Sequence, residues 1–199
     1  MKKIKKIAVL VSGSGTNLQA IIDAVQSGDL RDTEVSIVIS NKENAYALKR
    51  AENAGIQSVF LNPKDFKSSI EYDKQLIEMI SGYKIDLIVL AGYLRILSED
   101  LVKILQGKII NIHPALLPKF GGKNMYGERV HLAVLESEEK ESGCTVHFVD
   151  TGIDSGPVIA QRKVPVLEGD TVETLQKRIL IEEHKLIVEA IKTVLFVKV

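Results

Sequence analysis

The chain has 199 residues, of which 45% are hydrophobic and 26% charged, ordinary values for one soluble globular domain. Lysine plus arginine and aspartate plus glutamate both total 26, so no excess charge favours nucleic acid or an acidic membrane as partner. The single cysteine, Cys144, excludes an internal disulfide, and no apolar run approaches the length of a membrane span. We therefore expect a soluble cytoplasmic protein.

The first half of the chain alternates strand and helix patterns. Strands are expected over 4–11, 35–40, 57–61, 85–91 and 109–113, and helices over 18–26, 45–54, 69–80 and 99–105, the last capped by Ser98. This alternation predicts an α/β fold with a doubly wound, mostly parallel, Rossmann-like sheet.

After residue 113 the pattern changes. A Gly-rich loop over 118–127 precedes a helix over 128–137, and strands are expected over 145–149 and 158–164 as an antiparallel C-terminal part. Asp170 followed by Glu173 resembles a capping box that opens a final helix to about residue 196. The chain shows no linker or internal repeat, which predicts a single domain over residues 1–199.

The strand over 109–113 carries two polar side chains. Asn111 and His113 alternate with apolar residues, so both project to the same side of the strand. Pro114 cannot donate to a strand ladder, so the strand is expected to end at His113. Because ligands bind at the carboxyl ends of strands in open parallel sheets, this pair marks a candidate site.

A glycine-rich turn joins the first strand to the first helix. It contains Gly13, Ser14, Gly15, Thr16 and Asn17. Free backbone N–H groups and the helix dipole favour a phosphate at such a turn, although it could also be a tight turn without a ligand. The turn lacks the third glycine of the dinucleotide fingerprint and the Gly-Lys-Ser/Thr of a P-loop, so a monophosphate fits better than NAD or ATP.

A third polar residue, Asp154, lies in a Gly-flanked loop between the two last strands. Without a catalytic role, Asp154 would simply form the turn, and His113 would be a structural histidine whose ring nitrogens are hydrogen-bonded within the protein. An amide can stabilise an oxyanion and an imidazole can transfer a proton near pH 7, while a neighbouring carboxylate raises the histidine pKa. Asn111, His113 and Asp154 are therefore the candidate catalytic residues.

For the other titratable residues we expect structural or surface roles. His147 is expected to be structural or to support the site from its strand, and His131 and His184 to lie on a helix surface or in packing. Glu183 follows the pattern of a solvated helical face, and Arg50 that of surface charge. Four scattered histidines without ligand spacing predict no metal site.

Several motifs together resemble the phosphoribosylglycinamide formyltransferase family. They are Ser-Gly-Ser-Gly-Thr-Asn-Leu-Gln from 12, Leu-Ala-Gly-Tyr-Leu-Arg-Ile-Leu over 90–97, Asn-Ile-His-Pro-Ala-Leu-Leu-Pro over 111–118, and Thr-Val-His-Phe-Val followed by Asp-Ser-Gly-Pro-Val-Ile over 145–159. The resemblance covers nearly the whole chain and implies the formyltransferase fold.

The resemblance implies that 10-formyltetrahydrofolate donates its formyl group to the amine of 5'-phosphoribosylglycinamide, without a metal, in the third step of de novo purine synthesis. Asn111 would hold the formyl oxygen, the His113 cation would act as general acid, and Asp154 would raise the pKa of His113 and help remove the amine proton. The nucleotide would contact Gly13, Ser14, Gly15, Thr16, Asn17 and Glu183. The folate would contact Leu94, Arg95, Ile96, Leu97, Asn111, Asp150 and Asp154. Either a monomer or a homodimer is compatible with these expectations.

The chain departs from the family pattern at two places. Ser69 stands where the family often has an arginine that approaches the folate tail. The segment over 119–127 is longer than in the shorter family versions, and its glycines suggest a mobile flap over the folate.

Three other functions are weighed against this one. Formyltetrahydrofolate deformylase uses a similar Asn, His and Asp set but carries an N-terminal regulatory domain. Methionyl-tRNA formyltransferase adds a C-terminal domain and binds tRNA, for which this chain shows no basic excess. A non-catalytic nucleotide-binding module would keep the turn at Gly13 but gives no reason for Asn111, His113 and Asp154.

Overall fold

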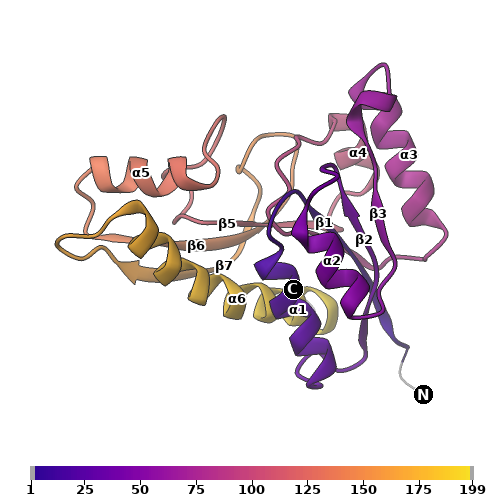
Figure 1. The fold of residues 1–199 in the computed structure, drawn as a ribbon, viewed down its shortest axis with the longest axis horizontal. Helices are drawn as coiled ribbons and strands as arrows, with labels where there is room; N and C mark the ends of the chain where they lie inside the picture. Colours follow the sequence, from indigo (N-terminus) through magenta and orange to yellow (C-terminus); the bar gives the residue numbers. More distant parts are fainter. Residues whose placement is uncertain (1–2, 198–199) are drawn as a thin grey trace.

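The computed structural model describes residues 3–197. It contains one seven-stranded sheet in the order β3-β2-β1-β4-β5-β6-β7 (Figure 1). The strands are β1 (Lys5–Val11), β2 (Thr33–Ser40), β3 (Ser58–Phe60), β4 (Leu87–Leu90), β5 (Ile109–His113), β6 (Glu141–Phe148) and β7 (Val158–Pro165).

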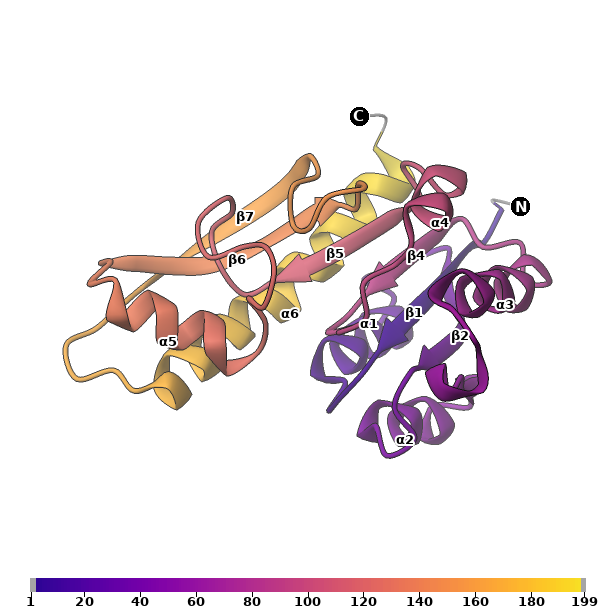
Figure 2. The same cartoon turned by 90° about the horizontal axis from the view of Figure 1, so that it is seen from above.

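The sheet is parallel up to β5 and antiparallel beyond it. β1 pairs in parallel with β2 and β4, and β4 with β5, whereas β5–β6 and β6–β7 are antiparallel. Figure 2 shows β6 and β7 extending away from the parallel strands, alongside α6. The predicted fold class, a mostly parallel α/β sheet with an antiparallel C-terminal part, is confirmed.

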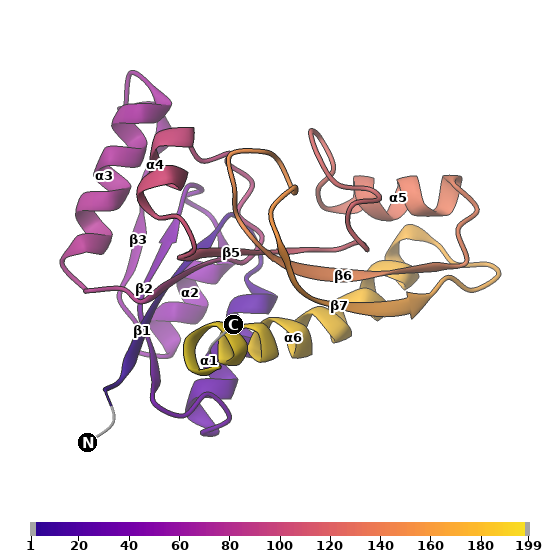
Figure 3. The same ribbon diagram turned by 180° about the vertical axis from the view of Figure 1, so that it is seen from behind.

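Helices cover both faces of the sheet (Figure 3). They are α1 (Thr16–Gln26), α2 (Tyr46–Asn53), α3 (Ser69–Ser81), α4 (Glu99–Ile104), α5 (Glu128–Glu136) and α6 (Val172–Phe196), with a short 3-10 turn, η1 (Pro63–Asp65). One core joins α1, α2 and α6 to β1 and β6, and the other joins α3 and α4 to the opposite side of β1, β2 and β4. Adjacent strand residues such as Ile7 and Ala8 enter different cores, as the period of a strand requires.

Two expectations need correction. The β6 strand begins at Glu141, four residues before the expected start at Thr145, because it pairs with β7 as far as Pro165. The capping box of the last helix is formed by Thr171 and Thr174, whereas Asp170 accepts hydrogen bonds from Arg178 and from Leu167 N. Within residues 3–197, no helix is both long and apolar enough to cross a membrane.

Candidate active site

A pocket of about 590 Å³ lies at the carboxyl ends of β1, β4 and β5. These strands are neighbours in the centre of the sheet, so the segments that follow them meet there. The structure brings all the residues predicted for catalysis and substrate binding to this one pocket: Gly13, Ser14, Gly15, Thr16, Asn17, Leu94, Arg95, Ile96, Leu97, Asn111, His113, Asp150, Asp154 and Glu183.

His113 ends β5 and is almost fully buried. Its Nε2 donates to the carbonyl of Phe120 at 2.8 Å, and its Nδ1 lies 3.6 Å from Oδ2 of Asp154. A carbonyl only accepts, so Nε2 carries a proton and Nδ1 is the nitrogen free to exchange one. Burial lowers the pKa of His113 below its ordinary value, although Asp154 and the Phe120 carbonyl act in the opposite direction. The expected effect of Asp154 is therefore present, but burial outweighs it.

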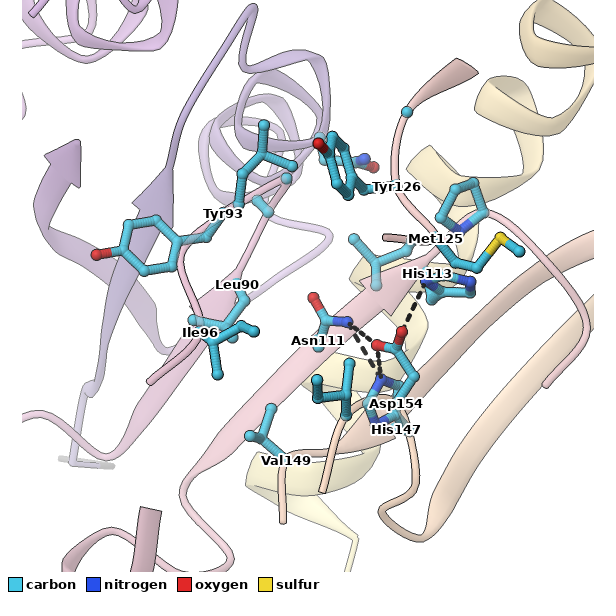
Figure 4. A pocket seen from close by; sticks show the side chains of 18 of the residues that line it. Leu90, Tyr93, Ile96, Asn111, His113, Met125, Tyr126, His147, Val149 and Asp154 are labelled. Carbon is cyan, nitrogen blue, oxygen red and sulfur yellow. Dashed lines mark hydrogen bonds and ion pairs between the residues drawn. The ribbon is translucent and has the colours of Figure 1, made fainter. Parts of the chain in front are cut away.

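Asn111 and His147 lie directly opposite each other on β5 and β6. Nδ1 of His147 donates to the carbonyl of Phe148 at 2.8 Å, so Nε2 is the acceptor for Nδ2 of Asn111 at 3.1 Å. The amide of Asn111 is thereby oriented with its second N–H toward Asp154, whose Oδ1 lies 3.4 Å from Nδ2 (Figure 4). This contact matches the supporting role expected for His147.

Asp154 joins the two histidines. Its Oδ1 lies 3.6 Å from Nε2 of His147, and its Oδ2 accepts the N–H of Gly122 at 3.0 Å. Burial alone would raise the pKa of Asp154, but the neighbouring imidazoles of His147 and His113 and the Gly122 N–H hold it below the ordinary value. The carboxylate therefore remains ionised at neutral pH and ties the loop after Pro118 to the site.

The glycine-rich turn closes one end of the pocket. Gly15 precedes α1 with a φ of +72°, and a Cβ there would lie 2.5 Å from Cβ of Ala47, so no larger residue fits without movement. The backbone N–H groups of Ser14, Gly15 and Thr16 have no acceptor among the residues that the structure describes. An anion can bind such a row of free N–H groups at a helix N-terminus.

Glu183 on α6 faces this turn across the pocket. The expectation of a solvated face is wrong, because α6 packs against α1 and leaves Glu183 only 7% exposed. Its Oε2 accepts from Nδ2 of Asn17 at 3.2 Å, and burial raises its pKa to about 7. Oδ1 of Asn17 is buried and has no protein donor in the described part of the chain. The carboxylate of Glu183 and Oδ1 of Asn17 can thus accept hydrogen bonds from a ligand's hydroxyl groups.

The opposite end of the pocket is apolar. Leu90, Ile96 and Val149 line it (Figure 4), and Ile96 is 65% exposed. The segment 94–97 is held by Ser12, whose Oγ accepts the N–H of Leu94 at 2.8 Å. The guanidinium of Arg95 lies over the ring of Tyr72 and donates to Oγ of Ser69 at 3.1 Å. Ser69, the departure from the family pattern, is therefore a partner of Arg95.

Sequence reasoning missed several residues of the site. Met125 and Tyr126 of the loop before α5 line the pocket, but nothing in their spacing marks them. His131, expected at a surface or in packing, is 2% exposed and also lines the pocket, and burial lowers its pKa to about 4. Arg50, expected as surface charge, donates to the carbonyl of Ser14 at 2.8 Å.

Within residues 3–197, no group of three or more His, Cys, Asp or Glu side chains is arranged to hold a metal ion.

Known proteins resemble the chain along nearly its whole length. The formyl transferase family model matches residues 5–191. The phosphoribosylglycinamide formyltransferase of Haemophilus influenzae is 45% identical over 184 residues, which is 92% of this chain and 84% of that protein. The trifunctional purine biosynthetic protein adenosine-3 of Drosophila pseudoobscura pseudoobscura is 48% identical over 181 residues, so the chain spans only 13% of the fly protein's length.

A solved structure agrees with these matches. The glycinamide ribonucleotide transformylase 1 of Symbiobacterium toebii superposes with a TM-score of 0.89 at 46% identity, covering 94% of this chain and 86% of that one.

Proposed function

Because this chain belongs to the phosphoribosylglycinamide formyltransferases of the formyl transferase family, we propose that it transfers a formyl group from 10-formyltetrahydrofolate to the amine of 5'-phosphoribosylglycinamide. A C–N bond forms between that amine and the formyl carbon, and the bond from the formyl carbon to the folate nitrogen breaks. One proton passes from the attacking amine to the leaving nitrogen. The products are N-formylglycinamide ribonucleotide and tetrahydrofolate.

The nucleotide binds at the turn and at α6. Its phosphate accepts the free N–H groups of Ser14, Gly15 and Thr16, with Gly13 and Asn17 flanking them. Its ribose hydroxyls donate to the carboxylate of Glu183 and to Oδ1 of Asn17, and they supply the partner that the buried Asn17 oxygen lacks.

The folate binds at the apolar end. Its flat ring fits between the segment 94–97 and Val149, where large apolar side chains are exposed in the pocket. The loop 150–154, with Asp150, covers the same end. When bound, this cosubstrate supplies the activated formyl group.

The reaction takes place between these two ends. One N–H of Asn111 Nδ2 stays on His147, which keeps the amide in place, and the other exchanges its long contact with Asp154 for the formyl oxygen, where it stabilises the negative charge that develops. His113 exchanges a proton at Nδ1, the nitrogen that faces Asp154. The ionised Asp154 stabilises the imidazolium while it exists. These roles are carried over from the family motif and supported by the geometry.

The observation that carries this proposal is the convergence of Asn111, His113 and Asp154 between an anion-binding turn and an apolar wall. The test follows tetrahydrofolate release with and without the nucleotide. Release that requires the nucleotide supports the transferase, whereas equal release without it identifies a deformylase. Loss of transfer in Asn111→Ala and His113→Ala with nucleotide binding retained separates an enzyme from a binding module.

We also propose that residues 1–199 act as one formyltransferase domain, in the cytoplasm, as a monomer or a homodimer. The two cores share one continuous sheet over the described residues, which supports a single folding unit. Sedimentation of the purified chain would establish its oligomeric state.

A further inference from the structure

We propose that Arg50 of α2 is a positioning residue that aims the phosphate-binding turn at the nucleotide, so that it sets affinity for the phosphate without touching the reacting atoms. The inference rests on the proposed nucleotide site and adds a residue that lies outside the pocket lining. Sequence reasoning treats Arg50 as surface charge, yet its guanidinium makes two hydrogen bonds to the turn and the helix that follows it.

Three consecutive carbonyl groups of the turn accept hydrogen bonds from neighbouring helices. The carbonyl of Gly13 accepts from Ala47 N at 3.1 Å, that of Ser14 from Arg50 Nε at 2.8 Å, and that of Gly15 from Gln19 N at 2.9 Å. Two of these donors belong to α2 and one to α1. Three consecutive carbonyls are therefore fixed from outside the pocket.

Fixing a carbonyl also fixes the next N–H. In a planar trans peptide the C=O and the following N–H point in opposite directions. Holding the carbonyls of Gly13, Ser14 and Gly15 therefore directs the N–H groups of the following residues, 14 to 16, away from those donors. These are the N–H groups that have no protein acceptor in the described part of the chain. The bond from Arg50 holds the middle peptide of the three.

Arg50 also brings charge to this end of the site. Among the residues that line the pocket, the lysines and arginines within the described part are Arg95 and Lys123, and the Arg95 guanidinium is engaged over Tyr72. The guanidinium of Arg50 is fixed on three sides, by Ser14, by Oε1 of Gln19 at 3.1 Å and by the ring of Tyr46. A positive charge held there attracts a phosphate dianion.

The experiment varies two things independently, the side chain at position 50 and the phosphate group of the substrate. Steady-state constants are measured for wild type, Arg50→Met and Arg50→Lys, with 5'-phosphoribosylglycinamide and with the same compound lacking the phosphate. Lys49→Met is the matched control, because Lys49 is the preceding residue of α2 and its one ion pair within residues 3–197 is with exposed Glu52. Melting temperatures show whether each variant is folded.

We expect Arg50→Met to raise KM for the phosphorylated substrate about tenfold or more, with kcat and KM for the folate nearly unchanged. Arg50→Lys should recover part of this loss, because it keeps the charge but not the planar fork. With the dephosphorylated compound, wild type and Arg50→Met should react at equal rates. Lys49→Met should resemble wild type with both compounds.

Equal losses with both compounds would overturn the proposal, because they would reflect general damage to the site. An unchanged KM for the phosphorylated substrate would overturn it as well. If the wild type transfers no formyl group, the proposed function fails, and calorimetric binding of ribose 5-phosphate to wild type, Arg50→Met and Lys49→Met still decides the role of Arg50. Tighter binding by wild type and Lys49→Met than by Arg50→Met supports it, and equal binding by all three contradicts it.

Discussion

The side-chain amide of Asn111 donates to Nε2 of His147 at 3.1 Å, across a directly paired position of β5 and β6. This bond orients an amide that would otherwise rotate, and the Phe148 carbonyl fixes the tautomer of His147 that accepts it. His147 therefore orients the side-chain amide of Asn111 without needing to contact the substrate.

Replacing His147 by Phe should remove the acceptor and keep the ring's volume. We expect kcat to fall roughly 10- to 100-fold, since loss of an oriented donor costs about 10²–10³ and here the donor itself remains. The KM for the nucleotide should change little. In the double variant Asn111→Ala/His147→Phe, kcat should equal that of Asn111→Ala alone; additive losses would show that His147 acts independently of Asn111.

Asp154 should control the titration of His113. Burial already holds the pKa of His113 below its ordinary value, and the carboxylate opposes that shift. Asp154→Asn removes the opposition, so the pKa should move lower still. If the His113 cation is the general acid, activity declines as pH rises through this pKa, and the decline should begin at lower pH in the variant. NMR titration of the imidazole and the pH–rate profile measure the shift; an unshifted pKa removes this role from Asp154.

Much of the site could be predicted because its signals are local. The end of β5 at His113 follows from Pro114, and alternation places Asn111 on the same side, as the shared pocket confirms. The burial of Glu183 could not be predicted, because it depends on packing between α1 and α6, which are far apart in sequence. Arg50 was missed for the same reason: its partner, Ser14, is 36 residues away.

Gly122 connects the loop over 119–127 to the catalytic carboxylate. Its φ is +96° and its N–H donates to Asp154, so Gly122→Pro loses both the conformation and the donor. We expect kcat to fall at least tenfold. Gly82→Ala, at the exposed end of α3, is the control. Hydrogen exchange over 119–127, measured with and without folate, tests whether this loop is a mobile flap. Unchanged kinetics in Gly122→Pro, together with exchange rates that do not change when folate binds, would contradict the flap.

Three histidines, two of them buried and one partly buried, should make the folded protein sensitive to acid. Burial lowers the pKa values of His113 and His184 and takes that of His131 to about 4. The unfolded chain binds these protons near pH 6.5, before the folded one does, so stability is complete above pH 6.5 and falls as pH decreases. His131→Gln should reduce the slope between pH 6 and 4 by up to about 1.4 kcal/mol per pH unit. Urea unfolding at several pH values measures it, and equal slopes for both proteins would contradict it.

Glu183 should show the opposite dependence. Burial raises its pKa to about 7 from an ordinary 4.5, so its contribution to stability is complete below pH 4.5 and is lost as pH rises through 7. At pH 8 the folded protein bears a buried carboxylate whose only protein hydrogen-bond partner in the described residues is Asn17. Glu183→Gln removes that charge and keeps an oxygen for the Asn17 amide. We expect the variant to be more stable than wild type at pH 8, by roughly 1–3 kcal/mol, and nearly equal at pH 5.

The same substitution should weaken the nucleotide site. A carboxylate accepts the ribose hydroxyls more strongly than an amide does, so KM for the nucleotide should rise about tenfold at pH 8. In wild type, KM should rise as pH falls below about 7, when Glu183 becomes protonated, whereas KM of the variant should not follow this titration. Glu182→Gln is the matched control, because Glu182 precedes Glu183 but pairs with Arg162 and Lys185. If Glu183→Gln is stabilised at pH 8 but its KM for the nucleotide equals that of wild type, the ribose does not contact Glu183 and binds elsewhere in the pocket.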